Sequence, residues 1–442
     1  MIIALSVPVV ASAGSNRNRD STEAMPVVTR RLLEAIDTTV KPCDDFEQFA
    51  NGRWRARQRR PNDSFNDLKN RIDDQMVSML DAARNQAATT TDPVVKLVAA
   101  WYASCHRADL HGIAVPLTPG RNYPGTQGLQ CLALTEETMQ PALEYIFVRQ
   151  AVTRPITTAV PMWLVQVRDA VRAQVQALSW VPDSVRTAAL RNLDSMHMRV
   201  QLAPDSIVYA GVILDSMNFQ ANRDTIRKAN ARLVQEAKDL QALRRPSKED
   251  NIPPKFVPYR VGAVAYRETG IVDISPALFQ PPFFDPAAES AANFAALGMA
   301  IGHEIWHLLT PTFKWVDMAE ARDRVTRLVD SYVRITGDGW GTVDEDLADL
   351  GGLSAAYAAW TLHGRGKASA KLEGFTPAQR FFLYYARLWR GTDLRTKNGG
   401  HSATRARVNG VVQQMPAFAH AFGCREGDAM FMPIDKQARV FE

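Results

Sequence analysis

The sequence predicts a mainly α-helical protein with a small β element. Apolar residues recur at helical spacing in one segment after another, which indicates amphipathic helices. One stretch, residues 261–276, instead combines Val, Ile and Tyr with a turn that contains glycine, and this pattern predicts a short strand pair. The 442-residue chain is 46% hydrophobic and 22% charged, which is typical of a globular protein rather than a disordered or membrane-embedded one.

The chain begins with the apolar stretch "MIIALSVPVVASAG", in which the small residues Ala11-Ser12-Ala13 follow the apolar run. This is the pattern of a signal peptide, although the usual basic start is missing. The alternative is a buried N-terminal strand, but the polar segment "GSNRNRDSTEAM" follows directly. We therefore expect a signal peptide over residues 1–13 and a periplasmic or secreted protein.

Helical periodicity then predicts the elements in chain order. The segment 244–255, "RRPSKEDNIPPK", is rich in Pro and Lys and is the clearest linker. It divides the chain into an N-terminal helical region over 14–250 and a C-terminal domain over 251–442. Helices are expected over 93–105, 139–151, 161–179, 183–196, 222–244, 286–309, 316–335, 343–361, 376–390 and 415–422.

Charge and cysteine content restrict the partners and the compartment. The formal net charge is only +5, too small to indicate a polyanion partner. The densest basic run, "GRWRARQRR" over 52–60, suits a solvated helix face or an anionic surface; we expect no nucleic-acid partner. Four cysteines suit an oxidising compartment, and none forms a C-x-x-C pair, so their three pairings stay open.

The string "IGHEIWHLL" carries the clearest chemistry in the chain. His303 and His307 are four residues apart, so a helix projects both from one face, where they can share a metal ion. Glu304 points to the flank, where it can act as the general base in this H-E-x-x-H arrangement. Asp285-Pro286 is expected to begin the helix and Thr310-Pro311 to end it.

A second acidic segment, "TVDEDLADLGGL" over 342–353, predicts the third metal ligand. A catalytic zinc of this type takes three protein ligands, and Glu345 is the natural candidate. Asp349, one turn further on, is spaced to accept the ring N–H of a ligating histidine. The alternative is that Thr342 and Glu345 form a capping box. We expect one zinc ion per chain.

Long motifs of the chain resemble the neprilysin family of zinc metallopeptidases. "KPCDDFEQFANGRW" is similar to the N-terminal signature of that family, and "FQPPFFDPAAESAANFAALGMAIGHEIWH" to its zinc-helix segment. "DEDLADLGGL" resembles its second zinc motif, "FTPAQRFFLYYARLW" the helix that follows, and "HSATRARVNGVVQQMPAFAHAFGCREGDAM" its C-terminal block. The resemblance implies a thermolysin-like gluzincin catalytic domain over 251–442, with a reduced helical covering lobe in the N-terminal region.

The resemblance also implies roles for individual residues. The zinc ligands would be His303, His307 and Glu345, with Glu304 as the base and Asp349 behind a ligand. His401 would stabilise the transition state and Arg407 would bind a substrate carbonyl. The substrate-binding positions would be Met299, Ala300, Leu388, Trp389, Gly262 and Ala263. The disulfides would be Cys43–Cys424 and Cys105–Cys131.

The implied activity is that of a zinc metalloendopeptidase, a monomer that cleaves peptides on the amino side of hydrophobic residues. Three departures support an alternative, a zinc-binding but catalytically weakened relative that acts as a peptide-binding module. Gly262 stands where the family has an Asn that clamps substrate, and Thr310 where it has an Asp that partners the second histidine. The third departure is the shortened lobe. The intact Glu304 favours the enzyme, because a binding module has no need of a base.

Overall fold

The computed structural model describes most of the chain after its first 26 residues. The predicted signal peptide over 1–13 lies outside the described residues, as does most of the predicted linker over 244–255. The described ranges are 27–110, 113, 126–204, 209, 211–243, 252–313, 318–337, 339–364, 371–394 and 400–442.

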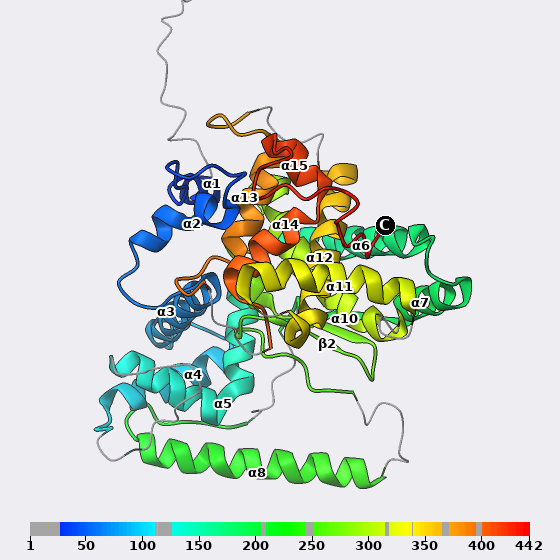
Figure 1. Cartoon of the computed structure of the whole chain (residues 1–442). Helices are drawn as coiled ribbons and strands as arrows, with labels where there is room; N and C mark the ends of the chain where they lie inside the picture. The colour runs from blue at the N-terminus through cyan, green and yellow to red at the C-terminus, as the bar shows by residue number, and fades with distance from the viewer. Residues whose placement is uncertain are drawn as a thin grey trace, which may run out of the picture.

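Helices dominate the described part of the chain, as the sequence predicts. Asp45, Asp63 and Asp92 begin α2, α3 and α4, because each side chain accepts a hydrogen bond from a backbone N–H of the first turn. The predicted start of α5 at residue 139 is wrong: Met139 is a break inside a longer helix. The first eight helices are α1 (Val27–Leu33), α2 (Phe46–Ala56), α3 (Ser64–Asn85), α4 (Pro93–Arg107), α5 (Gln127–Ala151), α6 (Arg154–Ala177), α7 (Asp183–Ser195) and α8 (Phe219–Leu243) (Figure 1).

The C-terminal helices surround the predicted metal motifs. Two π-helical segments interrupt them, over 294–298 and 406–410, and such segments are frequent at functional sites. The helices are α9 (Ser290–Asn293), α10 (Met299–Phe313), α11 (Ala319–Thr336), α12 (Val343–His363), α13 (Pro377–Leu388), α14 (Val411–Gln413) and α15 (Pro416–Phe422).

The helix predicted over 286–309 begins later than expected. Asp285 does not cap it; instead the Asn293 side chain accepts from Asp285 N at 2.9 Å and donates to Asp285 O at 2.8 Å. These two bonds tie Asp285 to the last residue of α9, so that residues 285–289 form a turn and the helix begins at Ser290. The prediction of a start at Pro286 fails because an Asp-Pro pair serves a turn as well as a helix.

The same helix also ends later than expected, since α10 continues through Pro311. A proline inside a helix removes the N–H that would bond the carbonyl four residues earlier, here His307 O. That oxygen accepts from Arg267 Nε at 3.0 Å and from Thr310 Oγ1 at 3.4 Å. Side chains therefore replace the missing backbone donor, and the helix tolerates its proline.

A three-stranded sheet lies beside α10. The predicted strand pair is confirmed: β2 (Ala263–Tyr266) and β3 (Ile271–Ile274) pair antiparallel. The strand β1 (His197–Val200), which the sequence did not predict, pairs parallel with β3, so that the order is β1-β3-β2. The sheet thus joins the N-terminal region to the C-terminal one.

Glycines bring α10 and α12 unusually close together. A Cβ on Gly302 would lie 2.9 Å from Gly352 Cα, and a Cβ on Gly352 would lie 2.6 Å from His303 N. Real side chains do not fit at such distances, so only glycine permits this approach. The contact sets the distance between the H-E-x-x-H motif on α10 and the acidic motif on α12.

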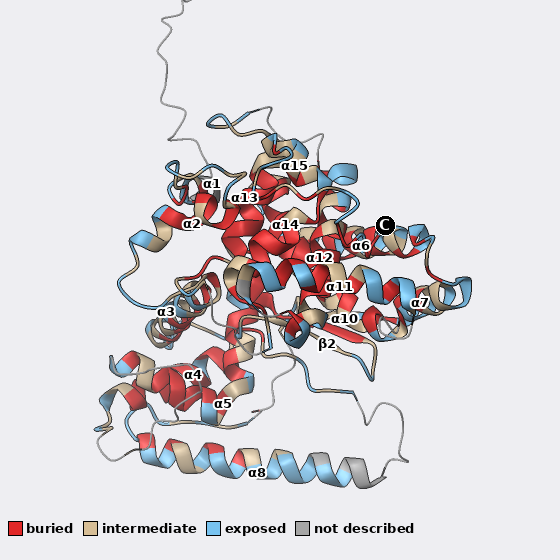
Figure 2. Cartoon of the chain, in the orientation of Figure 1, coloured by how far each residue is buried: buried red, intermediate tan, exposed pale blue. Residues whose placement is uncertain are grey.

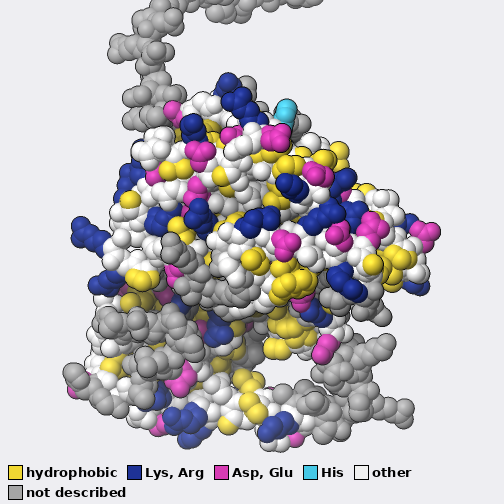
Figure 3. Space-filling model, viewed as in Figure 1, with side chains coloured by type: hydrophobic (Ala, Val, Ile, Leu, Met, Phe, Trp, Pro, Cys, Tyr) yellow, Lys and Arg dark blue, Asp and Glu magenta, His cyan; other side chains and the backbone are white. Residues whose placement is uncertain are grey.

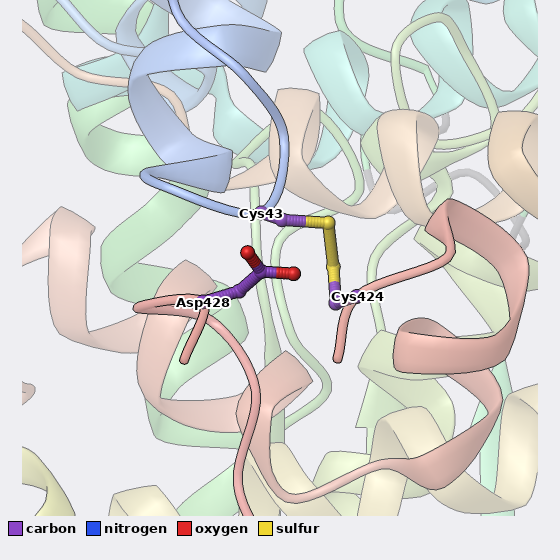
Figure 4. Close-up of side chains that lie close together, drawn as sticks. All are labelled: Cys43, Cys424 and Asp428. Carbon is purple, nitrogen blue, oxygen red and sulfur yellow. A yellow bond between two sulfur atoms is a disulfide. The ribbon is translucent and has the colours of Figure 1, made fainter. Parts of the chain in front are cut away.

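Packing across the whole molecule connects the two ends of the chain. One cluster of buried apolar side chains contains residues on both sides of position 250. The disulfides Cys43–Cys424 and Cys105–Cys131 form the pairing that the resemblance implies. Figure 4 shows Asp428 beside the first of them; because both sulfurs are engaged in the disulfide, these three side chains do not form a metal site.

The periphery is polar and its charges are mixed. The central helices α10 and α12 are largely buried, whereas α8 lies at one end of the molecule and is mostly exposed (Figures 1 and 2). Basic and acidic side chains alternate over the face in Figure 3 rather than gathering in one patch, which fits the small net charge. Among the described residues, no helix is both long and apolar enough to cross a bilayer.

Candidate active site

The predicted metal ligands converge between α10 and α12. His303 Nε2 and His307 Nε2 are 3.0 Å apart, as expected for residues one helical turn apart. Glu345 Oε2 lies 3.2 Å from His303 Nε2 and 3.3 Å from His307 Nε2. Two imidazole nitrogens and one carboxylate oxygen thus point at one location, and this donor set suits zinc.

A further histidine joins this group from the C-terminal block. His401 Nε2 lies 3.0 Å from Glu345 Oε2, and the His401 side chain is 39% exposed. Burial alone would raise the pKa of Glu345, but hydrogen bonds from His303, His307 and His401 lower that pKa far below its ordinary range. The carboxylate is therefore held in its charged form, as a metal ligand requires.

The side of His303 away from the ligand group is buried and anionic. His303 Nδ1 lies 2.8 Å from Asp349 Oδ1, in the arrangement predicted from the sequence. Asp349 also accepts from Arg407 Nε and Nη2, both at 2.6 Å. Burial opposes ionisation of Asp349, but Arg407 and His303 outweigh it and lower the pKa of Asp349. Burial likewise opposes the charge on His303, yet Asp349 and Glu345 raise the pKa of His303 to about 9.

The side of His307 away from the ligand group has a different partner. Arg267 Nη2 lies 3.5 Å from His307 Nδ1, while Arg267 Nε donates to His307 O. Thr310, which stands where the resembling family has an aspartate, is buried and directs its hydroxyl to the same carbonyl. A guanidinium, not a carboxylate, therefore faces the ring nitrogen of His307.

The capping-box alternative for Thr342 and Glu345 does not hold, because Thr342 makes no side-chain capping bond to α12. Thr342 Oγ1 instead lies 2.9 Å from Asp346 Oδ2 and 2.7 Å from Ser402 Oγ. Burial, with the nearby charge of Asp349, raises the pKa of Asp346 to about 8. This buried network joins the start of α12 to the residue that follows His401.

The ligand group borders a cavity of about 420 Å³. It is lined by all six residues that the resemblance assigned to substrate binding, and by Glu304, His401 and Arg407. The guanidinium carbon of Arg407 lies 3.4 Å from the centre of the Trp389 ring. The Glu304 side chain is half-buried at this cavity, beside rather than within the ligand group.

Several lining residues were missed by the sequence analysis. Phe65 packs against Phe283 and Trp389, with ring centres 5.1 and 5.5 Å apart, so the N-terminal region supplies part of an aromatic wall. No motif marked Phe65, because its contribution comes from packing across more than 200 residues of sequence. The other missed lining residues are Asp63, Leu278, Phe283, Arg390, Ser402 and Thr404.

Gly262, at the position of the family's clamping Asn, lines the cavity with its backbone only. A Cβ at this position would lie 3.1 Å from Phe256 Cζ, a contact closer than nearly all real side chains make. The Phe256 ring thus occupies the space that a larger side chain at 262 would enter. Residue 262 thus offers no side-chain amide to the cavity, and Phe256 fills the space where such a side chain would lie.

Comparisons with known proteins assign this geometry to a family. Two family models, both described as Peptidase family M13, match residues 42–114 and 265–438, together more than half of the chain. Neprilysin-3 of Drosophila melanogaster is 27% identical over 339 residues, or 68% of this chain and 42% of that protein. Endothelin-converting enzyme 1 of Bos taurus is 24% identical over 68% of this chain and 43% of its own length. The chain thus spans less than half the length of these relatives.

Solved structures show the same fold. The Mycobacterium tuberculosis zinc metalloprotease Zmp1 in complex with an inhibitor superimposes with a TM-score of 0.71 and 17% identity, over 93% of this chain and 99% of that chain. The open state of Zmp1 gives a TM-score of 0.61 at 25% identity, over 72% of this chain and 53% of that chain. These likenesses confirm the predicted thermolysin-like gluzincin fold.

Proposed function

Because the chain belongs to peptidase family M13, we propose that it is a zinc-dependent metalloendopeptidase that hydrolyses peptide bonds in peptides. The observation that carries this proposal is the convergence of His303, His307 and Glu345 within 3.3 Å of one another. Of these three residues, His303 lines a cavity that is also lined by the carboxylate of Glu304.

The residues fit a zinc ion by their chemistry. Two neutral imidazoles and one carboxylate are a common ligand set of catalytic zinc, which keeps a fourth position open. The low pKa of Glu345 keeps this ligand charged, and the contact of His303 Nδ1 with Asp349 orients the His303 ring. When bound, zinc would supply Lewis acidity for water and for the substrate carbonyl. We propose one ion per chain.

The chain's own side chains would carry the proton transfers. Glu304 borders the cavity next to His303, where its carboxylate accepts the proton of the attacking water and passes it to the leaving amine. His401 Nε2 lies 3.0 Å from Glu345 Oε2, the oxygen that also faces His303 and His307, and His401 would donate a hydrogen bond to the oxyanion. Arg407 lines the same cavity; Asp349 holds its guanidinium in place for a substrate carbonyl.

The cavity supports a preference for hydrophobic residues after the scissile bond. Phe65, Phe283, Met299, Leu388 and Trp389 form a mostly apolar lining, and burying a large apolar side chain there contributes about 1.5–3 kcal/mol. Gly262 offers no side-chain amide to the substrate backbone. We therefore propose that side-chain burial, rather than a backbone clamp at 262, selects the substrate.

The location and organisation of the protein follow as proposals from the same features. Two disulfides suit an oxidising compartment, secreted or periplasmic. We propose a catalytic domain over 251–442 and an N-terminal helical region over 14–250. The contacts of Phe65 support the view that the N-terminal region completes the cleft. The monomeric state stays a prediction.

The activity is tested with a mixed peptide library and mass spectrometry of the products. We expect cleavage before hydrophobic residues, its loss with a zinc chelator and its return with added zinc. Glu304→Gln should keep the metal and lose activity by about a hundredfold or more, because the water has no proton acceptor. Cleavage that survives in a folded Glu304→Gln protein would contradict the mechanism.

A second candidate function is a peptide-binding module with weak catalysis. The arginine beside His307 and the missing amide at Gly262 favour it. The same library separates the two functions: a binding module retains intact peptides on the zinc-loaded protein, whereas the enzyme releases cut ones.

A further inference from the structure

Arg267 lies at the start of the turn between β2 and β3, directly behind one of the proposed zinc ligands. Its Nε donates to His307 O at 3.0 Å, and its Nη2 lies 3.5 Å from His307 Nδ1. The guanidinium therefore spans the backbone and the ring of the same histidine. A third, longer contact of 3.7 Å connects it to Asp344 Oδ2.

The contact with His307 O is explained by Pro311. Proline has no N–H, so the carbonyl four residues before it lacks its helical donor, and Arg267 Nε supplies one. This bond holds the guanidinium against α10. The position of Nη2 beside the His307 ring is a consequence of that anchoring, and the guanidinium cannot leave without removing a donor from His307 O.

The contact with the ring opposes metal binding. A histidine that binds zinc through Nε2 carries its proton on Nδ1 and donates it to a carboxylate, a carbonyl or water. A guanidinium has five N–H donors and no acceptor. Within the part of the chain that the structure describes, no carboxylate lies within 4.0 Å of His307 Nδ1, and Thr310 directs its hydroxyl to the backbone. With zinc on Nε2, donor would face donor, and a positive charge would lie close to the metal.

We propose that Arg267 lowers the zinc affinity of the site, so that zinc binding must displace this guanidinium from the His307 ring. The inference rests on the proposed zinc site and adds a residue that tunes its occupancy. Asp344 is the neighbouring carboxylate to which the displaced guanidinium can turn. The protein should therefore exchange its metal more readily than a site with carboxylates behind both histidines.

The test is a zinc titration in competition with a chelator dye, at equilibrium, for four proteins. Arg267→Gln keeps a donor for His307 O and gains an acceptor for Nδ1–H, so its Kd for zinc should fall about tenfold, the lower end of the usual effect of a ligand's partner. Arg267→Lys keeps the positive charge and should stay within about threefold of the wild type. Arg227→Gln removes an exposed arginine on the remote helix α8 and should change nothing.

A purely structural role for Arg267 predicts that its replacement does not strengthen zinc binding. If it served only to satisfy His307 O, its replacement would weaken zinc binding or leave it unchanged, and either result in Arg267→Gln would overturn the inference. Zinc binding with equal Kd in all four proteins would overturn the inference and leave the proposed function intact. A complete lack of zinc binding in all four would overturn both.

Discussion

The two histidines of the metal site differ in what lies behind them. Behind His303, Asp349 accepts from the ring and is itself held by Arg407, all in the buried interior. Behind His307, one helical turn away, the exposed cation Arg267 faces the ring. The H-E-x-x-H spacing places both rings equally well, but it does not decide how well each ring is prepared to bind a cation.

The comparison of the two histidines indicates that the zinc affinity of such a site depends on residues outside the H-E-x-x-H motif. The buried side is preorganised, because Asp349 fixes the orientation of the His303 ring before any metal arrives. On the exposed side the metal competes with a guanidinium. We therefore expect substitutions on the buried side to have large effects on both stability and affinity, and substitutions on the exposed side to act on affinity alone.

The largest effect is expected for Asp349→Ala. It leaves Arg407 buried without its partner, which should lower the free energy of unfolding by about 3–5 kcal/mol. It should also weaken zinc binding about 10- to 100-fold. Urea unfolding and chelator competition measure the two effects. The control Asp344→Ala removes an exposed carboxylate from the same helix and should change stability by less than about 0.5 kcal/mol. Equal losses of stability in Asp349→Ala and Asp344→Ala would contradict the expected difference between the buried and the exposed side of the site.

The second effect concerns the glycine contact that positions the buried side. In Gly352→Ala the new Cβ would lie 2.6 Å from His303 N and 2.8 Å from Met299 O, so α10 and α12 must move apart. Overpacking of this kind should destabilise the protein by about 1–3 kcal/mol and weaken zinc binding as Glu345 withdraws. Leu362→Ala, at the exposed end of α12, is the control. Unchanged stability in Gly352→Ala would mean that the helices are not in close contact.

The smallest effect tests whether a buried carboxylate with a single cationic partner is charged at neutral pH. Glu47 is fully buried and pairs with Arg55 at 2.8 Å, yet burial outweighs this single cation and raises the pKa of Glu47 above 4.5. As pH rises, the unfolded chain loses this proton before the folded one does. The wild type should therefore lose stability relative to Glu47→Gln as pH rises through the folded pKa.

Chemical denaturation of both proteins between pH 5 and pH 8 measures this difference. A difference that is constant with pH, or that changes in the opposite direction, would contradict the raised pKa of Glu47. Asp349 differs from Glu47 because it has two cationic partners rather than one. The negative charge of Asp349 would then result from Arg407 and His303 and not from burial.

The sequence predicted the parts of the site that depend on local spacing. His303 and His307 share a face of α10, and Glu345 and Asp349 share a face of α12, because residues four apart on a helix do so, whereas Glu304 follows His303 on the flank. The strand pair was also predicted from its turn. The strand β1 was not, because its four residues carry little signal and pair with β3 across more than 70 positions.

Other parts depend on tertiary contacts that no local pattern reveals. Phe65 reaches the cavity only because α3 packs beside the segment that follows Trp389. Arg267 meets His307 only because a proline left a carbonyl without its donor. The predicted helix start at Pro286 and helix end at Pro311 failed for the same reason, since side chains distant in sequence or in the next turn satisfied the backbone groups that normally set helix limits.

The most direct test of the account is the zinc content of three purified proteins, measured by elemental mass spectrometry after dialysis against trace zinc. We predict one zinc per chain in the wild type and in Glu304→Gln, because Glu304 lies beside the ligand group and not within it. Glu345→Ala should retain almost none, because the two histidines alone leave the site without its anionic ligand. Unchanged zinc in Glu345→Ala, or no zinc in the wild type, would contradict the assignment of His303, His307 and Glu345 as the metal ligands.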